Sequence, residues 1–312
     1  MHREGADAAR ATDPELSVLA FGAGQDSTAL LYKYIYDAEF RRRYAPRRFL
    51  VIFCETGVES PSTYLHLEEV KQLCARRHVP FAHVTPEMDG GRYYARSWRD
   101  LISHYERTET CGSRSGYSRS CTVNLKIVPF ANYLEEWVGR EYNLRGTRKQ
   151  GLVAYARLYR KIRVIVGLAR GEESRVADPA DAPKWRQRSI ETVYPLIDLG
   201  MDRADCQRYI LSLGHPLPYP SHCLICHFTN EIGLLWLYRT HPDVYWRWVA
   251  IEVRKIAKFA RRGLAPNRNH GVFGARLLPD VLAEARLKYG HLTHEEIDRY
   301  KLSYGHCVRS KY

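Results

Sequence analysis

The residues with the clearest chemical meaning follow a short apolar run near the start of the chain. The run LSVLAF (16–21) leads into GAGQDST (22–28). Small residues let backbone amides approach an anion, and the N-terminus of a following helix adds about half a positive charge. Ser27 or Thr28 could donate a hydroxyl hydrogen bond to a phosphate, and Asp26 could cap the helix or hold a metal. This pattern predicts a phosphate-binding turn, with a plain glycine-rich turn as the alternative, because neither a Walker lysine nor a dinucleotide fingerprint is present.

A second chemical signal is the pair Cys223 and Cys226 in SHCLICHF. A two-residue spacer lets both thiolates face one metal, as in zinc and iron–sulfur sites. The alternative without metal is that both are unligated core cysteines. The flanking His222 and His227 also leave a Cys/His zinc site open. Three further cysteines fall in predicted strands or helices and are expected to be small buried residues: Cys54, Cys74 and Cys206.

The composition of the chain is that of an ordinary folded protein. It has 312 residues, 45% hydrophobic and 27% charged, which excludes disorder as the dominant state. No run of about 18 apolar residues is present, so a membrane protein is not expected. The first residues lack the apolar core of a secretory signal, which predicts a cytoplasmic, reducing compartment. There, eight cysteines indicate metal or redox chemistry more often than disulfides.

The charge is strongly positive. Lys and Arg number 48 against 35 Asp and Glu, a net +13, which favours polyanionic partners such as nucleic acid or phosphorylated ligands. Residues 140–163 hold eight basic residues and one Glu, and 251–276 hold seven and one. Tyr142, Tyr155 and Tyr159 lie within the first segment, a pattern suited to phosphate contact with base stacking. Solvated helix faces are the alternative interpretation.

The elements that must position these residues alternate between strands and helices. Apolar runs predict strands at 16–21, 49–54, 81–84 and 162–168, and periodicity predicts helices at about 27–43, 62–77 and 129–138. The alternation indicates an α/β fold with a parallel sheet. Beyond Asp198 the pattern is helical, near 202–213, 231–239, 242–262 and 293–303. The polar stretch 88–125 is too long for an ordinary connection and predicts a functional loop.

This organisation gives three parts: a flexible lead-in at 1–14, a nucleotide-binding α/β domain at 15–200, and a helical C-terminal region at 201–312 that carries cysteine ligands. Helical spacing predicts two inward-facing sets in the first two helices: Leu30, Leu31 and Tyr34, and then Leu65, Val70 and Leu73. The tryptophans of the C-terminal helices are expected to be core residues: Trp236, Trp246 and Trp248.

Several segments, taken in order, resemble one superfamily. GAGQDS is similar to the SGGxDS loop of the PP-loop ATP pyrophosphatases, with Gly22 in place of Ser and Ala23 in place of Gly. The variant is closest to the PAPS-reductase-like branch. ETGVESPSTY (55–64) resembles its DTG-x-E-x-P-x-T segment, and GLARGEESR (167–175) its G-I-x-x-x-E-x-x-R segment. A Tyr-Pro-Leu turn at 194–196 and Arg203 also match, so the similarity runs from about residue 16 to 307.

The resemblance implies a PP-loop, adenine nucleotide alpha hydrolase-like core that binds ATP with Mg²⁺. Carried over residue by residue, it implies nucleotide-binding roles for Phe21, Gly22, Ala23, Gly24, Gln25, Asp26, Ser27, Thr28, Glu55, Thr56, Gly57 and Lys126. It implies catalytic roles near the phosphates for Asp26, Ser27, Glu172 and Arg175. For Glu172 and Arg175 a surface i,i+3 ion pair is the alternative, and for Lys126 a solvated lysine.

The same resemblance extends the cysteine site. Cys121, in CTVNLKIVP, matches a C-T-x-x-x-K-I-x-P segment of PAPS-reductase-like proteins and of the ATP pyrophosphatase subunit of DNA phosphorothioation systems. Cys307, in YGHC, matches a Gly-His-Cys of phage-type members. The implied ligands of a [4Fe–4S] cluster are Cys121, Cys223, Cys226 and Cys307. Zn²⁺ is the alternative metal, and Cys111 substitutes if Cys307 performs redox chemistry.

Three functions follow as hypotheses. The first is an ATP pyrophosphatase that adenylylates a substrate, possibly DNA or tRNA, for attack by a sulfur or other nucleophile, with a sulfur-donor protein as a possible partner. The second is a sulfonucleotide reductase that uses Cys307 as its nucleophile, although the E-C-G-L-H motif of that family is absent. The third is a non-catalytic nucleic-acid-binding module that holds a nucleotide and a cluster as ligands.

Overall fold

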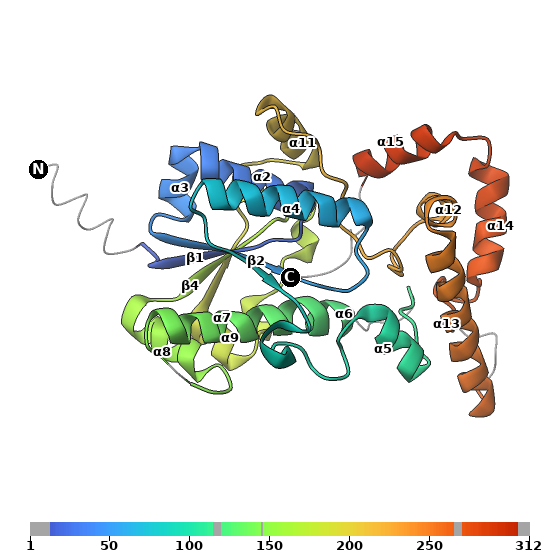
Figure 1. Cartoon of the computed structure of the whole chain (residues 1–312), viewed down its shortest axis with the longest axis horizontal. Helices are drawn as coiled ribbons and strands as arrows, with labels where there is room; N and C mark the ends of the chain where they lie inside the picture. The colour runs from blue at the N-terminus through green and yellow to red at the C-terminus, as the bar shows by residue number, and fades with distance from the viewer. Residues whose placement is uncertain (1–12, 115–119, 145, 265–269, 305–312) are drawn as a thin grey trace, which may run out of the picture.

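A parallel five-stranded sheet forms the centre of the computed structural model, which describes residues 13–114, 120–144, 146–264 and 270–304. The strand order is β3-β2-β1-β4-β5, and every pair is parallel (Figure 1). The strands are β1 (Leu16–Ala20), β2 (Arg48–Cys54), β3 (Phe81–Val84), β4 (Ile162–Val166) and β5 (Ile190–Val193). The predicted α/β fold is therefore confirmed.

Helices cover both faces of this sheet (Figure 1). Alternate residues of β2 serve the two sides: Val51 and Phe53 pack with one layer, and Leu50 and Ile52 with the other. The first layer contains α2 (Gln25–Tyr36), α3 (Ala38–Tyr44), α4 (Pro61–Arg76) and α11 (Arg203–Ser212). The second contains α7 (Val128–Glu141), α8 (Gln150–Tyr159) and α9 (Lys184–Ser189). Burial on both faces explains why the strands are continuous apolar runs.

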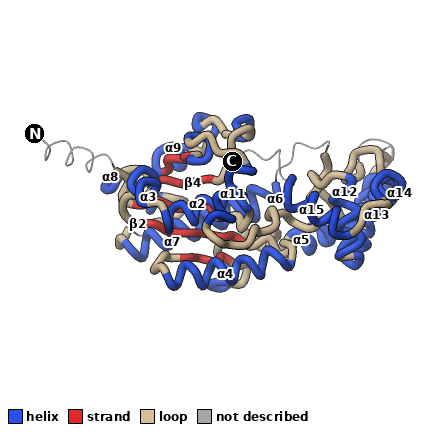
Figure 2. Tube along the Cα trace, turned by 90° about the horizontal axis from the view of Figure 1, so that it is seen from above, coloured by secondary structure: helices blue, strands red, loops and turns tan. Residues whose placement is uncertain are grey.

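The C-terminal helices gather at one end of the sheet, next to α5 (Leu101–Thr108), as Figures 1 and 2 show. They are α12 (Glu231–Thr240), α13 (Pro242–Arg261), α14 (Leu278–Tyr289) and α15 (His294–Tyr304). Glu252 of α13 is 1% exposed and accepts hydrogen bonds from the amides of Val272 and Leu278, both at 2.7 Å. The predicted helical C-terminal region is confirmed, and none of the helices in the described ranges is long and apolar enough to cross a membrane.

Short helical turns complete the described chain. One is a π-helical turn, η2 (Val123–Ile127), which lies between α6 (Ser120–Thr122) and α7. Such turns are rare and are frequently found at functional sites. The others are η1 (Met88–Gly91), η3 (Glu173–Arg175), η4 (Pro179–Asp181) and α10 (Pro195–Asp198).

Four local expectations were wrong. The stretch 88–125 is not one long loop, because it contains η1, α5 and α6, and α5 buries Leu101, Ile102 and Tyr105. The single helix expected at 27–43 is two helices, because Asp37 leaves the helical conformation and its carboxylate caps α3 by accepting from the amides of Glu39 and Phe40. Leu65 is 70% exposed, because the inner face of α4 carries Leu67, Val70 and Leu73 instead. Trp246 is 53% exposed, unlike Trp236 and Trp248, which are buried.

The sheet topology defines one crevice. From β1 the chain proceeds through β2 to β3 on one side, then crosses to β4 and β5 on the other. Neighbouring strands that diverge in this way leave a crevice at their carboxyl ends, where open α/β sheets bind ligands. The turn after β1 and the loop after β4 both lie at this point.

Candidate nucleotide and cysteine site

The turn after β1 is a closed loop ahead of α2. The amide of Gly22 donates to Oγ of Ser27 at 3.2 Å, and that hydroxyl donates to the carbonyl of Gly24 at 3.1 Å. Ala23 adopts a left-handed conformation, with φ of 56°, which costs an ordinary residue about 1–2 kcal/mol. Strain of this kind concentrates at functional loops, and the first-turn amides of α2 are donors for an anion.

Two other segments pack directly on this turn. A Cβ atom added at Gly24 would lie 3.1 Å from the amide nitrogen of Ser221, and one at Gly167 would lie 3.0 Å from that of Ser27. The turn after β1 therefore needs glycine at position 24 where it meets the loop that precedes Cys223, and the loop after β4 needs glycine at position 167 where it meets the turn. The turn after β1, the loop after β4 and the cysteine loop form one continuous unit.

This close packing predicts the effect of a single methyl group. Gly167→Ala should lower the free energy of unfolding by about 1–3 kcal/mol, because backbone atoms at 3.0 Å cannot move away as a flexible side chain would. Gly22→Ala is the matched control, since its Cβ would meet only side-chain oxygens at ordinary contact distance, Oγ of Ser221 at 3.6 Å and Oγ of Ser27 at 3.9 Å. Denaturant unfolding of both variants measures the difference, and equal losses would contradict the packing argument.

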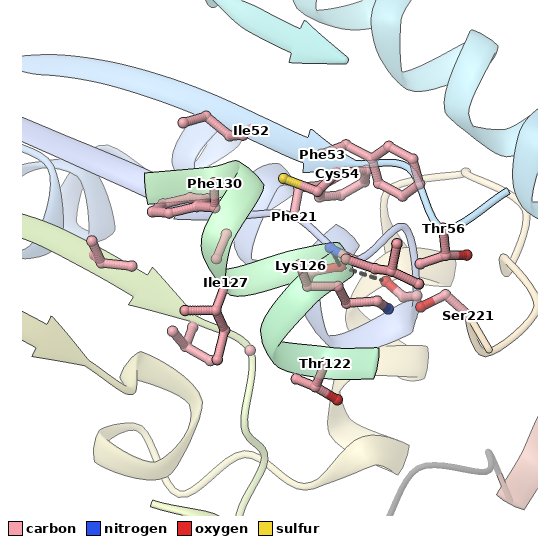
Figure 3. A pocket seen from close by; sticks show the side chains of 18 of the residues that line it. Phe21, Ile52, Phe53, Cys54, Thr56, Thr122, Lys126, Ile127, Phe130 and Ser221 are labelled. Atoms are coloured by element: carbon pink, nitrogen blue, oxygen red, sulfur yellow. Dashed lines mark hydrogen bonds between the residues drawn. The ribbon is translucent and has the colours of Figure 1, made fainter. Parts of the chain in front are cut away.

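A cavity of about 260 Å³ opens at the crevice. Its walls come from the turn after β1, the ends of β2 and β4, η2, α7, α9 and the cysteine loop. In Figure 3 the side chains of Lys126, Thr56 and Ser221 point toward the same part of it, while Ile127 and Phe130 form an apolar portion. The predicted residues that line this cavity are Phe21, Gly22, Gly24, Gln25, Asp26, Ser27, Thr56, Lys126, Arg175, Cys121, Cys223 and Cys226.

A chain of ion pairs borders the cavity. Nη2 of Arg203 lies 3.2 Å from Oδ2 of Asp26 and 3.5 Å from Oε1 of Glu172, and Nη1 of Arg175 lies 2.7 Å from the same Glu172 oxygen. Burial alone would lower the pKa of Arg203, but the two carboxylates outweigh it and raise that pKa. The side chains of Glu172 and Arg175 are each 9% exposed, so this is a buried pair rather than a surface one. Arg203 and Arg175 both line the cavity, and Glu172 lies behind them.

Glu55 has a different position from the expected one. Its Oε1 accepts from the amides of Thr56 and Gly57 at 2.8 and 2.7 Å and from the Tyr64 hydroxyl at 2.8 Å, and Oε2 lies 3.2 Å from Nε2 of His83. Burial raises the pKa of Glu55, but hydrogen bonds from His83, Gly57 and Tyr64 together bring it below its ordinary value. This carboxylate shapes the turn after β2 and does not line the cavity.

Three other predicted nucleotide-binding residues also lie outside the cavity wall. The hydroxyl of Thr28 is fully buried, 2.9 Å from Nε2 of His66. Ala23 is fully buried, and Gly57 has a positive φ of 76° beside Asp100. Their nucleotide roles remain predictions, and the structure gives each of them a part in shaping the loops.

Glu59 is a site residue that sequence reasoning missed. Its Oε1 accepts from the Thr56 hydroxyl at 3.0 Å, lies 3.7 Å from Nζ of Lys126 and 3.9 Å from Sγ of Cys223. Its other oxygen, Oε2, is buried and has no hydrogen-bond partner among the described residues. Its backbone forms an antiparallel bridge with Cys223. Glu59 stands within the quoted ETGVESPSTY segment, which was the available signal.

The described cysteines of the predicted metal site converge. Cys121, Cys223 and Cys226 line the same cavity, and Cys111 lies near them. Burial and then the charges of these four cysteines raise the pKa of Tyr105, which is 5% exposed, well above its ordinary value. No group of three or more His, Cys, Asp or Glu side chains within the described ranges is already arranged as a metal site. Cys307 lies outside the described residues.

The donor set nevertheless fits a soft metal. Cys121, Cys223 and Cys226 contribute to the wall of one cavity, and thiolates select zinc or iron–sulfur clusters. Burial raises the pKa of Cys111 to about 11 and also raises that of Cys223, so these thiols are protonated without a metal. A metal ion would displace those protons. Cys54, Cys74 and Cys206 are buried, as predicted.

The two histidines beside the cysteine pair differ. Nδ1 of His222 lies 2.9 Å from the Pro220 carbonyl, and Nε2 lies 3.0 Å from Nζ of Lys301. Both nitrogens of His222 are therefore engaged. Burial, aided by Arg114 and Lys255, lowers the pKa of His227 to about 4. The neutral ring of His227 keeps a Cys/His zinc site open.

The basic segments are partly structural. Tyr155 is fully buried, and its ring centroid lies 4.8 Å from that of Tyr142 and 5.2 Å from that of Tyr159. These rings pack on one another rather than standing as separate stacking platforms. In the second segment, Arg261 pairs with Glu109 at 2.7 Å. Base stacking by the first segment therefore has support only at Tyr159, which is 40% exposed.

Sequence reasoning also missed Trp185 and Arg186 of α9 and Ser221, which line the cavity. Nothing in their local sequence signals this, since it arises from the packing of α9 beside β5 and of Ser221 against Gly24. A comparison of the chain with models of known protein families finds no match. No curated protein sequence matches it either.

Proposed function

We propose that this chain is an ATP pyrophosphatase of the PP-loop class that adenylylates an acceptor substrate. The observation that carries the proposal is the cavity at the crevice, where the N-terminus of α2 faces Lys126, Arg175 and Arg203. Amides, a hydroxyl and three cations around one cavity suit a polyphosphate. The ordered resemblance of the loops after β1, β2 and β4 to PP-loop segments supports adenosine triphosphate as that polyphosphate.

In the proposed reaction an acceptor oxygen attacks the α-phosphorus of ATP. A new P–O bond forms, the bond to the bridging oxygen of the β-phosphate breaks, pyrophosphate leaves, and the acceptor proton passes to solvent. A sulfur or nitrogen nucleophile then displaces AMP. Lys126, Arg175 and Arg203 offset the charge that moves onto pyrophosphate, and catalysis depends on positioning and charge stabilisation.

Asp26 fits a Mg²⁺ ion that accompanies ATP. One carboxylate oxygen is held by Arg203, while Oδ1 is buried without a hydrogen-bond partner among the described residues. Carboxylates bind Mg²⁺ together with substrate phosphates. Bound Mg²⁺ would supply charge neutralisation at the phosphates.

The cysteine site extends the proposal. Cys121, Cys223 and Cys226, with Cys307 or Cys111, would hold a [4Fe–4S] cluster or Zn²⁺. A bound cluster would supply electron-transfer chemistry, whereas zinc would supply structure alone. The cysteine loop packs on the phosphate-binding turn at Gly24, which favours a shared role in one reaction, with DNA or tRNA as possible acceptors and a protein as a possible sulfur donor.

The activity is tested by two parallel assays on the anaerobically purified full chain. We expect exchange of labelled pyrophosphate into ATP when a DNA or tRNA pool is supplied as acceptor, and no sulfite from adenylyl sulfates. Strong sulfite release that Cys307→Ser abolishes would instead establish the reductase. Salt-sensitive nucleic-acid binding with neither reaction would establish the binding module.

The metal site is tested by counting metal. Cys223→Ser should reduce bound iron or zinc by more than half, with loss of absorbance near 400 nm if the metal is a cluster, because it removes a ligand. Cys74→Ala is the matched control, since Cys74 is a buried thiol of α4 outside the cavity. Zinc without iron in the wild type would reject the cluster, and equal metal content in both variants would reject the ligand assignment.

A further inference from the structure

The cavity at the crevice has two ends with different chemistry. Figure 3 shows Ile127 and Phe130 on the side of the cavity away from Thr56 and Ser221. The polar end lies at the turn after β1, whereas the other end lies between the sheet and the second helix layer. We call this other end the apolar chamber. Its lining side chains are hydrocarbon and come from α7, α8, β4 and β5: Phe130, Ala131, Leu134, Leu152, Val164 and Ile190.

The apolar chamber reaches into the core. Leu134 and Leu152 are fully buried, and Ala131 and Val164 are each 5% exposed, although all four line the cavity. Protein interiors normally contain few voids larger than a water molecule, and unfilled apolar volume destabilises a fold. Apolar cavities of this kind stay dry and bind apolar molecules. A chamber that opens into the ligand crevice of an α/β sheet therefore indicates a ligand with an apolar group.

The wall of the apolar chamber does not suit a nucleobase. The nitrogen and oxygen atoms of a base need hydrogen-bond partners when they leave water, and burying them without partners is costly. The six side chains that define the chamber carry no hydrogen-bonding atom. The backbone of β4 is already engaged, because this strand lies between β1 and β5 and pairs with both. A hydrocarbon group needs no such partner, so it fits this wall better than adenine does.

Two aromatic rings favour an aromatic ligand over an aliphatic one. Phe130 and Trp185 both line the cavity and are partly buried, and aromatic rings that pack together gain more than their buried area alone provides. Arg186, which follows Trp185 in α9, also lines the cavity, and its Nη2 makes only a long contact of 3.5 Å with Oγ1 of Thr192. Ligand pockets combine an apolar wall with a few polar groups that fix orientation, and Arg186 can hold the polar end of such a ligand.

We propose that the apolar chamber is a binding site for a small aromatic molecule, held beside ATP in the same cavity. Its hydrocarbon ring packs among the six chamber residues, while the triphosphate occupies the polar end at the turn after β1. The inference rests on the proposed function only in placing ATP at that end. Because both ends belong to one cavity, a ligand bound in the chamber lies next to the site of the proposed adenylyl transfer.

The probe is toluene, titrated into the full-length protein by calorimetry. We expect wild type to bind it, since the cavity holds about 260 Å³ and an apolar cavity of about 150 Å³ accommodates benzene. Ala131→Leu fills the chamber from α7 and should weaken toluene binding at least about tenfold. Val164→Ile adds one carbon from the sheet and should weaken it about threefold, which keeps the test valid if the larger substitution misfolds. Ala154→Leu, at a partly buried alanine of α8 outside the cavity wall, is the control and should bind toluene as wild type does.

A second titration with MgATP separates this site from an adenine pocket. Toluene and MgATP should bind wild type together, each within about twofold of its affinity alone, because they occupy different ends of the cavity. Competition between them, or loss of MgATP binding in folded Ala131→Leu, would overturn the inference, since adenine would then fill the chamber. Failure of toluene to bind wild type, or equal binding to Ala131→Leu, would overturn it and leave the proposed function intact. Toluene binding that Ala131→Leu abolishes, without any MgATP binding, would support the aromatic site and reject the proposed function.

Discussion

Arg203→Met is expected to weaken MgATP binding by about 100-fold, since hydrogen bonds to charged groups contribute about 1.5–3 kcal/mol each. Arg203 bridges Asp26 at 3.2 Å and Glu172 at 3.5 Å beside the phosphate-binding turn. Without it, Asp26 in the cavity wall and Glu172 behind the wall have one fewer cation beside them, and they repel the triphosphate. Isothermal titration calorimetry of the folded variant measures the loss.

Two variants of the same helix sharpen this experiment. Arg208→Met removes an arginine whose side chain is 69% exposed, and it should bind MgATP as wild type does. Arg203→Lys keeps the charge but not the planar fork, so an intermediate loss of about tenfold is expected. If Arg203→Met binds MgATP as tightly as wild type, with folding verified by circular dichroism, the triphosphate does not bind in this cavity.

The second large effect concerns stability. Glu55→Gln should lower the free energy of unfolding by about 2–3 kcal/mol at pH 7, because the carboxylate accepts from two amides and the Tyr64 hydroxyl, and an amide group cannot replace all these contacts. Denaturant unfolding at several pH values measures it. The control is Glu68→Gln, at a position 63% exposed, which should change little.

The pH dependence has a definite sign. The pKa of Glu55 in the folded protein lies below its ordinary value of 4.5, so its stabilisation is complete above the unfolded-state pKa and is lost as the pH falls through the folded-state pKa. The difference in free energy of unfolding between wild type and Glu55→Gln should therefore be full at neutral pH and become smaller as the pH falls below the ordinary pKa of 4.5. A difference in free energy of unfolding that stays constant as the pH falls would contradict an ionised Glu55 in the folded protein.

The strands that could be predicted from sequence are those buried on both faces. Ile162–Val166 reads as an uninterrupted apolar run because helices cover both its sides. The edge strand β5, Ile190–Val193, has the sequence IETV and is only partly buried, so no apolar run marks it. The helix break at Asp37 had a signal, an N-cap aspartate, that apolar periodicity concealed.

The parts of the candidate site that could be predicted are those whose residues lie close together in the sequence. The turn after β1 carries its glycines, Asp26 and Ser27 within a few residues of one another. The closeness of Lys126 to Glu59, or of Ser221 to Gly24, comes from the packing of segments far apart in the chain. Trp185 and Arg186 show the same limit, because only the fold brings them into the wall of the cavity.

The bridge between Glu59 and Cys223 has an evolutionary consequence. The amide of Leu224 donates to the Val58 carbonyl at 2.8 Å, so main-chain atoms fasten the cysteine loop to the turn after β2. Main-chain attachment tolerates exchange of the side chains that project from it. Substitutions at the cysteines can therefore change the chemistry of this loop while the turn after β2 keeps it attached.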